Sequence, residues 1–259
     1  MAFRPANISA HTMKFNSAAS GDFIYLYERL VDNEIAARNA QPKHQTFAPS
    51  QMRCDRISWF RLRGVQPDKI KTPDRTLEFS ANVGAACHEI IQKRLANCTD
   101  IKWLQVDDWL LSHGQIFDWT VRQNGYEQQI ECYKPFPIRF ACDGLIEFKG
   151  KTYLLEIKTS EFSSFQELIS PKEKHIDQIE CYAALLDISN VLVLYQDRQY
   201  GGLKCFEIVI SDREKQEIIN KMQHVMDLVE AHIAPDRLPK GDPDCTPNMC
   251  PYFEKCKEW

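Results

Sequence analysis

The first half of the chain is patterned mainly for helices. Segment 21–40 has polar and apolar faces and predicts a helix, and a loop containing Pro and Gln follows at 41–51. Segment 80–96 predicts a second helix, with Ser80 as its N-cap. Three tryptophans in segment 100–131 favour helical packing around a core.

The hydrophobic period changes in the second half. Residues 138–148 and 151–158 are β-like runs, and the pair between them, Lys149-Gly150, is typical of a two-residue hairpin turn. Tail 235–259 is rich in proline and irregular. Between hairpin and tail the spacing predicts a helix, two strands and a long helix, at 172–188, 191–196, 204–210 and 211–233. We therefore expect an α/β fold.

Composition describes an ordinary soluble protein. The hydrophobic fraction is 44%, the charged fraction is 26%, and no apolar run is long enough to cross a bilayer. We therefore expect a cytoplasmic protein, or one in the host cytoplasm if a phage encodes it, with no membrane partner. The net charge of -4 argues against a uniformly basic coat for nucleic acid.

A local basic surface is nevertheless possible in segment 53–75, where seven basic residues stand against three acids and are interleaved with Trp59 and Phe60. Such a surface could face DNA phosphates. A solvated helical face with two buried aromatics is the alternative. The candidate DNA contacts are Arg53, Arg56, Arg61 and Arg63.

The hairpin carries candidate chemistry. A simple turn at Lys149-Gly150 places Asp143 opposite Glu156, and like charges so placed are destabilising without compensation. Lys158 shares the face of Glu156 because side chains alternate along a strand. Oxygen ligands of this kind suit Mg²⁺ or Mn²⁺, which activate water for attack on phosphates. A bulge at Gly144 would change this register, and ordinary surface charges are the alternative interpretation.

These residues and their neighbours resemble a known family, the RecB-like branch of the PD-(D/E)XK nuclease superfamily. The resemblance covers about residues 52–259 and implies a restriction-endonuclease-like mixed central sheet flanked by helices, with residues 1–51 as a helical N-terminal extension. It rests on the order of a helix with Gly84 and His88, then Asp143, then Glu156-Ile157-Lys158, then Gln178 and Tyr182.

The resemblance also implies roles for these positions. His88 and the Ile157 carbonyl would join Asp143 and Glu156 as ligands of the metal, and Lys158 would position the attacking water. Gln92 shares the helical face of His88. Gln178 and Tyr182 would assist substrate placement, and His175 lies on the same helical face.

Three of the ten cysteines lie close together in the proline-rich tail, at Cys245, Cys250 and Cys256. Three ligands in one loop predict a fourth elsewhere, and Cys54, just after a loop, is the best candidate. The arrangement is similar to that of the iron–sulfur members of the family, the CRISPR-associated RecB-like and AddB-type nucleases, which implies a 4Fe-4S cluster closing the nuclease domain. Zn²⁺ is the alternative occupant.

The leading functional hypothesis is therefore a Mg- or Mn-dependent DNA nuclease. The resemblance favours exonuclease action on single-stranded DNA, in phage or prokaryotic DNA processing, recombination or repair, with possible protein partners in a replication, recombination or CRISPR complex. A catalytically silent DNA-binding or assembly subunit is one alternative. A redox or metal-sensing protein built around the cluster is another.

Overall fold

The chain forms two compact units in a computed structural model that describes residues 18–41, 44–68, 74–114, 116–247 and 249–258. The first unit lies within Met1–Gln41 and Ile70–Glu78, and the second within Pro42–Lys69 and Phe79–Trp259. Each unit is described by its own internal contacts.

Ion pairs connect the two helical segments of the first unit. Helix α1 (Ala18–Ala40) confirms the helix predicted at 21–40, and Ile35 is its only buried residue among those described. Arg75, the first residue of α3 (Arg75–Ala96), pairs with Glu28 at 2.8 Å and with Asp32 at 2.7 Å. These pairs are partly exposed, so each contributes little to stability.

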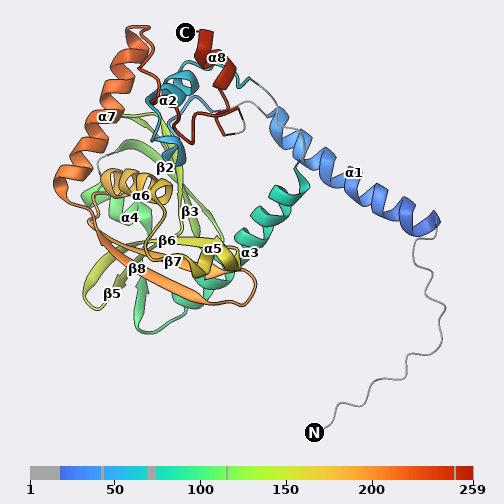
Figure 1. Cartoon of the computed structure of the whole chain (residues 1–259). Helices are drawn as coiled ribbons and strands as arrows, with labels where there is room; N and C mark the ends of the chain where they lie inside the picture. Colours follow the sequence, from blue (N-terminus) through green and yellow to red (C-terminus); the bar gives the residue numbers. More distant parts are fainter. Residues whose placement is uncertain (1–17, 42–43, 69–73, 115, 248, 259) are drawn as a thin grey trace. The chain divides into compact units, whose positions relative to one another are not determined.

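A mixed five-stranded sheet forms the centre of the second unit (Figure 1). Neighbouring strands are antiparallel except β6 and β7, which are parallel. Helix α6 (Glu173–Leu186) lies between these two in the chain and makes the crossover that parallel strands require. In spatial order the strands are β1 (Ile101–Trp103), β5 (Gly144–Phe148), β6 (Lys151–Ser160), β7 (Asn190–Asp197) and β8 (Leu203–Val209).

Helices cover both faces of this sheet. Leu155 and Ile157 of β6 pack with Ile91 of α3. Leu154 belongs to the main core, together with Ile179 of α6. Because successive strand residues face opposite sides, α3 and α6 flank opposite faces. Helix α7 (Asp212–Glu230) packs on α6 and on α2 (Asp55–Leu62). The predicted mixed sheet flanked by helices is thus confirmed.

A smaller antiparallel sheet lies between β1 and β5 in the chain. It contains β2 (Phe117–Asn124), β3 (Glu127–Lys134) and β4 (Ile138–Cys142), and the chain leaves β4 for β5 at Asp143. The prediction of one strand over 138–148 is therefore wrong, because this run divides between two sheets. Helical packing over 100–131 is also wrong, since α4 (Val106–His113) is the only helix described there.

The predicted hairpin turn is confirmed. Lys149 and Gly150 have φ values of 50° and 75°, the left-handed pair that a tight turn between twisted strands needs. Phe148 then pairs with Lys151, and the ladder runs out to Gly144 opposite Leu155. The glycine at 144 is not a bulge in this ladder.

The later elements follow the sequence closely. The predicted elements at 172–188, 191–196, 204–210 and 211–233 appear as α6, β7, β8 and α7. Ser80 is not an N-cap, because α3 begins five positions earlier at Arg75. The remaining short helices are η1 (Pro49–Gln51), α5 (Phe162–Gln166) and α8 (Phe253–Glu258).

The tail docks on the segment around α2. The Asp68 carboxylate accepts hydrogen bonds from the backbone N–H groups of Glu254 and Lys255, at 2.5 and 3.0 Å. Tyr252 stacks on Phe60, with ring centroids 5.0 Å apart.

In the described part of the chain, no helix has the length and apolar character needed to span a membrane.

Candidate active site

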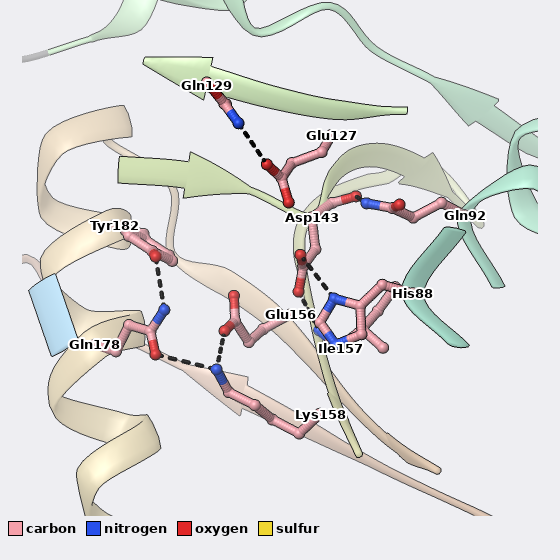
Figure 2. Close-up of polar contacts among 10 residues, drawn as sticks. All are labelled: His88, Gln92, Glu127, Gln129, Asp143, Glu156, Ile157, Lys158, Gln178 and Tyr182. Atoms are coloured by element: carbon pink, nitrogen blue, oxygen red, sulfur yellow. Dashed lines mark hydrogen bonds and ion pairs between the residues drawn. The ribbon is translucent and has the colours of Figure 1, made fainter. Parts of the chain in front are cut away.

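Asp143 lies where the chain passes from one sheet to the other, and its position is fixed by hydrogen bonds (Figure 2). Its Oδ2 accepts from the Ile157 N–H at 2.7 Å, and its Oδ1 lies 3.2 Å from His88 Nδ1. The Asp143 carbonyl oxygen accepts from Gln92 Nε2 at 2.7 Å. The carboxylate is therefore held between α3 and β6.

Glu156 lies beside Asp143 and is almost fully buried, with 2% of its surface exposed. Its Oε1 is 2.5 Å from Lys158 Nζ, two residues further along β6 on the same face. Burial raises the pKa of Glu156 to about 7, and the charge of Asp143 adds to the effect. Two carboxylates thus share a small volume with one lysine, which favours the presence of a further cation.

A row of hydrogen bonds connects Lys158 to α6. Lys158 Nζ donates to Gln178 Oε1 at 3.0 Å, and Gln178 Nε2 donates to the Tyr182 hydroxyl at 2.6 Å (Figure 2). Tyr182 is buried and stacks on Phe140, and burial raises its pKa well above the ordinary value. The tyrosine therefore stays protonated and acts as a hydrogen-bonding group.

His88 and His175 have opposite electrostatic environments. Burial lowers the pKa of His88, but the hydrogen bond to Asp143 and its charge outweigh burial, so the net pKa is raised. The pKa of His175 falls to about 3 because of burial and the nearby charge of Lys158. His175 Nδ1 lies 2.7 Å from the Tyr195 hydroxyl, which also accepts from the Lys172 N–H. His175 is therefore neutral at ordinary pH.

The backbone is shaped for close approach between α3 and β6. A Cβ atom at Gly84 would lie 3.2 Å from Thr159 Oγ1. One turn later, His88 faces Asp143. The small residue at 84 thus lets α3 lie close enough to β6 for the histidine to reach the carboxylate.

The structure adds Glu127, which the sequence interpretation missed. Its carboxylate accepts from Gln129 Nε2 at 3.0 Å, and Figure 2 shows both side chains on the β3 side of Asp143. The β3–β4 register pairs Gln128 with Cys142, so one further step brings Glu127 beside Asp143. Alternation along β3 places residues 127 and 129 on one face, but only the pairing of β3 with β4 shows that this face lies beside Asp143.

The side chains that the sequence singled out thus come together: His88, Asp143, Glu156, Lys158, Gln178 and Tyr182, with the Ile157 backbone. Among the described residues, no three His, Cys, Asp or Glu side chains are arranged so that they could hold one metal ion. Asp143 and Glu156 are instead held by hydrogen bonds to the protein. Their roles stay predictions.

The four cysteines proposed as cluster ligands line a single cavity. Cys54, at the start of α2, meets Cys245, Cys250 and Cys256 of the tail there. Burial raises the pKa of Cys250 to about 11, with smaller contributions from the other three thiols. Residues distant in sequence are therefore neighbours at this cavity.

The four candidate DNA-contacting arginines have protein partners. Arg53 pairs with Glu173, Asp242 and Asp244. Arg61 Nε donates to the Thr46 carbonyl, and Arg63 lies over the Trp59 ring. The Arg56 side chain is 5% exposed. DNA contact by these residues stays a prediction, and the burial of Arg56 argues against it there.

Comparison with known proteins gives fold likeness only. No family model matches the chain, and no curated protein matches it significantly. Among solved structures, SSO0001 has 15% identity and a TM-score of 0.45, covering 83% of this chain and 98% of that one. An alkaline exonuclease from Laribacter hongkongensis, LHK-Exo, in complex with dAMP, has 16% identity and a TM-score of 0.46, covering 73% and 90%. Function has to be inferred from this chain's own side chains.

Proposed function

We propose that the chain is a metal-dependent DNA nuclease of the RecB-like PD-(D/E)XK type, which hydrolyses phosphodiester bonds and acts as an exonuclease on single-stranded DNA. The observation that carries the proposal is the buried Asp143–Glu156 pair, with Lys158 in contact with Glu156. Burying two like charges together is costly, so a fold that keeps them needs a cation there.

The residues around the pair fit Mg²⁺ or Mn²⁺, because hard divalent ions prefer carboxylate and carbonyl oxygens. Asp143, Glu156, the Ile157 carbonyl and His88 would hold the ion. Once bound, it would supply positive charge at the phosphate and make water a better nucleophile. Lys158, whose Nζ lies at the Glu156 carboxylate, would orient the attacking water.

Gln178 and Tyr182 keep Lys158 in place. The amide of Gln178 spans the lysine and the tyrosine hydroxyl, so the orientation of the amide is fixed from both ends. Because both Glu156 and Gln178 hold Nζ, the lysine would keep one position during the reaction. Loss of the glutamine would therefore impair the reaction through the lysine.

A cleavage assay tests this proposal. End-labelled single-stranded DNA is incubated with Mg²⁺ or Mn²⁺ and either the natural chain, Glu156→Gln or Glu147→Gln. Glu147 is a matched control, because it lies on the adjacent strand with a half-exposed side chain paired to Lys102. We expect loss of cleavage for Glu156→Gln alone. Cleavage that survives this change contradicts the site assignment, and a natural chain that binds DNA without cleaving it favours the silent subunit.

We further propose that Cys54, Cys245, Cys250 and Cys256 bind a 4Fe-4S cluster that joins the tail to α2. Support comes from the meeting of these four thiols at one cavity. Four cysteine thiolates suit a 4Fe-4S cluster, in which each iron takes one thiolate, and they also suit a single zinc ion. Iron, sulfide and zinc analysis of protein purified without oxygen distinguishes the two.

A further inference from the structure

Arg56 is a buried cation without a matching anion. It follows Cys54 by two positions in α2, and its side chain is 5% exposed. Its Nε is buried and has no hydrogen-bond partner, and among the described residues no carboxylate forms an ion pair with it. An arginine side chain cannot lose its charge in a protein, so this environment is costly as it stands.

A contact of the Arg56 guanidinium with a cysteine points to the missing anion. Arg56 Nη1 donates to Cys256 Sγ at 3.8 Å, and Arg56 lines the same cavity as the four cysteines. Asp244, an acid that lines this cavity, already pairs with Arg53 at 3.2 Å. The remaining source of negative charge is the set of sulfur atoms, which are thiolates when they bind a metal.

We infer that Arg56 is the counter-charge and hydrogen-bond donor of the metal–thiolate group held by Cys54, Cys245, Cys250 and Cys256, and not a contact to DNA. This inference rests on the proposed cluster. Arg56 is thus a positioning residue, because it holds the sulfur of Cys256 and offsets the charge of the thiolates.

A redox consequence follows from the charge. A reduced cluster carries one more negative charge than an oxidised one, so a nearby cation stabilises the reduced form. Hydrogen bonds to the sulfurs act in the same direction, and both are known determinants of cluster potential. Arg56 therefore raises the reduction potential and slows loss of the metal group.

The test compares three variants purified without oxygen. Arg56→Met removes the charge and the donors at similar length, and Arg56→Lys keeps the charge but loses the planar set of donors. Arg213→Met is the control, because it removes an arginine that is exposed on α7 and paired to Glu217. Iron and sulfide content, the rate of bleaching by a chelator, and the midpoint potential are measured for each.

We expect Arg56→Met to bleach at least tenfold faster and to have a more negative midpoint potential, Arg56→Lys to be intermediate, and Arg213→Met to match the natural chain. If Arg56→Met is insoluble, the same comparison is made between Arg56→Lys and the natural chain. Unchanged bleaching and potential in the Arg56 variants would overturn the inference.

Measurements of metal content and of DNA cleavage distinguish a failure of this inference from a failure of the proposed cluster or the proposed nuclease activity. A natural chain that carries no metal at these cysteines overturns the cluster and the role of Arg56 together. A chain that carries zinc overturns the cluster and its redox consequence, and the rate of metal loss to a chelator then decides the role of Arg56. A natural chain that carries the cluster but does not cleave DNA with Mg²⁺ or Mn²⁺ contradicts the nuclease proposal, while the chelator and potential measurements still decide the role of Arg56.

Discussion

Replacing Glu156 by Gln should make the metal-free protein more stable and abolish its stabilisation by metal. The pKa of Glu156 is raised from 4.5 to about 7 by burial and by Asp143. A raised carboxyl pKa means that the unfolded chain releases its proton at lower pH than the folded chain. The buried carboxylate therefore lowers the stability of the folded state above pH 4.5. The loss grows up to about pH 7, where it reaches about 3 kcal/mol, because each unit of pKa shift corresponds to about 1.4 kcal/mol.

The amide in Glu156→Gln has no charge to bury, so this destabilisation disappears, less what the lost contact with Lys158 contributed. We expect metal-free Glu156→Gln to melt at about 5 °C or more above the metal-free natural chain at about pH 8, and at a similar temperature at about pH 4.5. Mg²⁺ or Mn²⁺ at about 100 times its Kd should stabilise the natural chain by about 2.7 kcal/mol and leave the variant unchanged.

The assay is thermal unfolding followed by circular dichroism, with chelator or with added metal, at the two pH values. Glu147→Gln is the control, since its side chain is half exposed and should give small changes under every condition. The reasoning is refuted if metal-free Glu156→Gln is clearly less stable than the natural chain at about pH 8, or if metal stabilises both to the same extent.

Two further predictions concern packing and pH. Gly144→Ala should destabilise the protein by about 1–3 kcal/mol in chemical unfolding, because the new Cβ would lie 2.6 Å from Trp103 Cη2; a change under about 0.5 kcal/mol would show that Trp103 moves freely. His175→Gln should reduce the loss of stability on acidification. The folded chain resists protonation of His175, whose pKa is about 3, while the unfolded chain takes up a proton below pH 6.5. After allowing for solvent screening, the natural chain should therefore lose about 1 kcal/mol more unfolding free energy than the variant between about pH 7.5 and 5. Equal losses would contradict a buried, neutral His175.

Local signals explain which parts of the fold were predictable. The Lys149-Gly150 turn was predictable because Gly150 readily adopts the positive φ that a tight turn needs, and the turn then fixes the register of β5 and β6. The helix α7 begins at a Ser211–Glu214 capping box, which is also local. These elements need no distant partner to define them.

The errors arose where strand identity depends on distant contacts. The run 138–148 is continuously β-like, and the change of sheet at Asp143 is visible only once β4 pairs with β3 and β5 pairs with β6. Strands β2 and β3 were missed for a similar reason, since the half-exposed face of a small sheet has weak hydrophobic alternation.

The candidate site divides in the same way. Asp143, Glu156 and Lys158 were identified from hairpin register and alternation, and the structure does bring them together. Glu127 was missed because it reaches Asp143 through a strand pairing that the sequence did not predict. Arg56 was assigned to DNA from charge alone, since the sequence gives no sign that its side chain turns inward toward the cysteines.

Degradation of end-labelled single-stranded DNA by the purified chain is the most direct test of the central claim. The account predicts cleavage that requires Mg²⁺ or Mn²⁺, is abolished by chelator and by Glu156→Gln, and persists in Glu147→Gln. Cleavage without a divalent ion, or undiminished cleavage by Glu156→Gln, would contradict it.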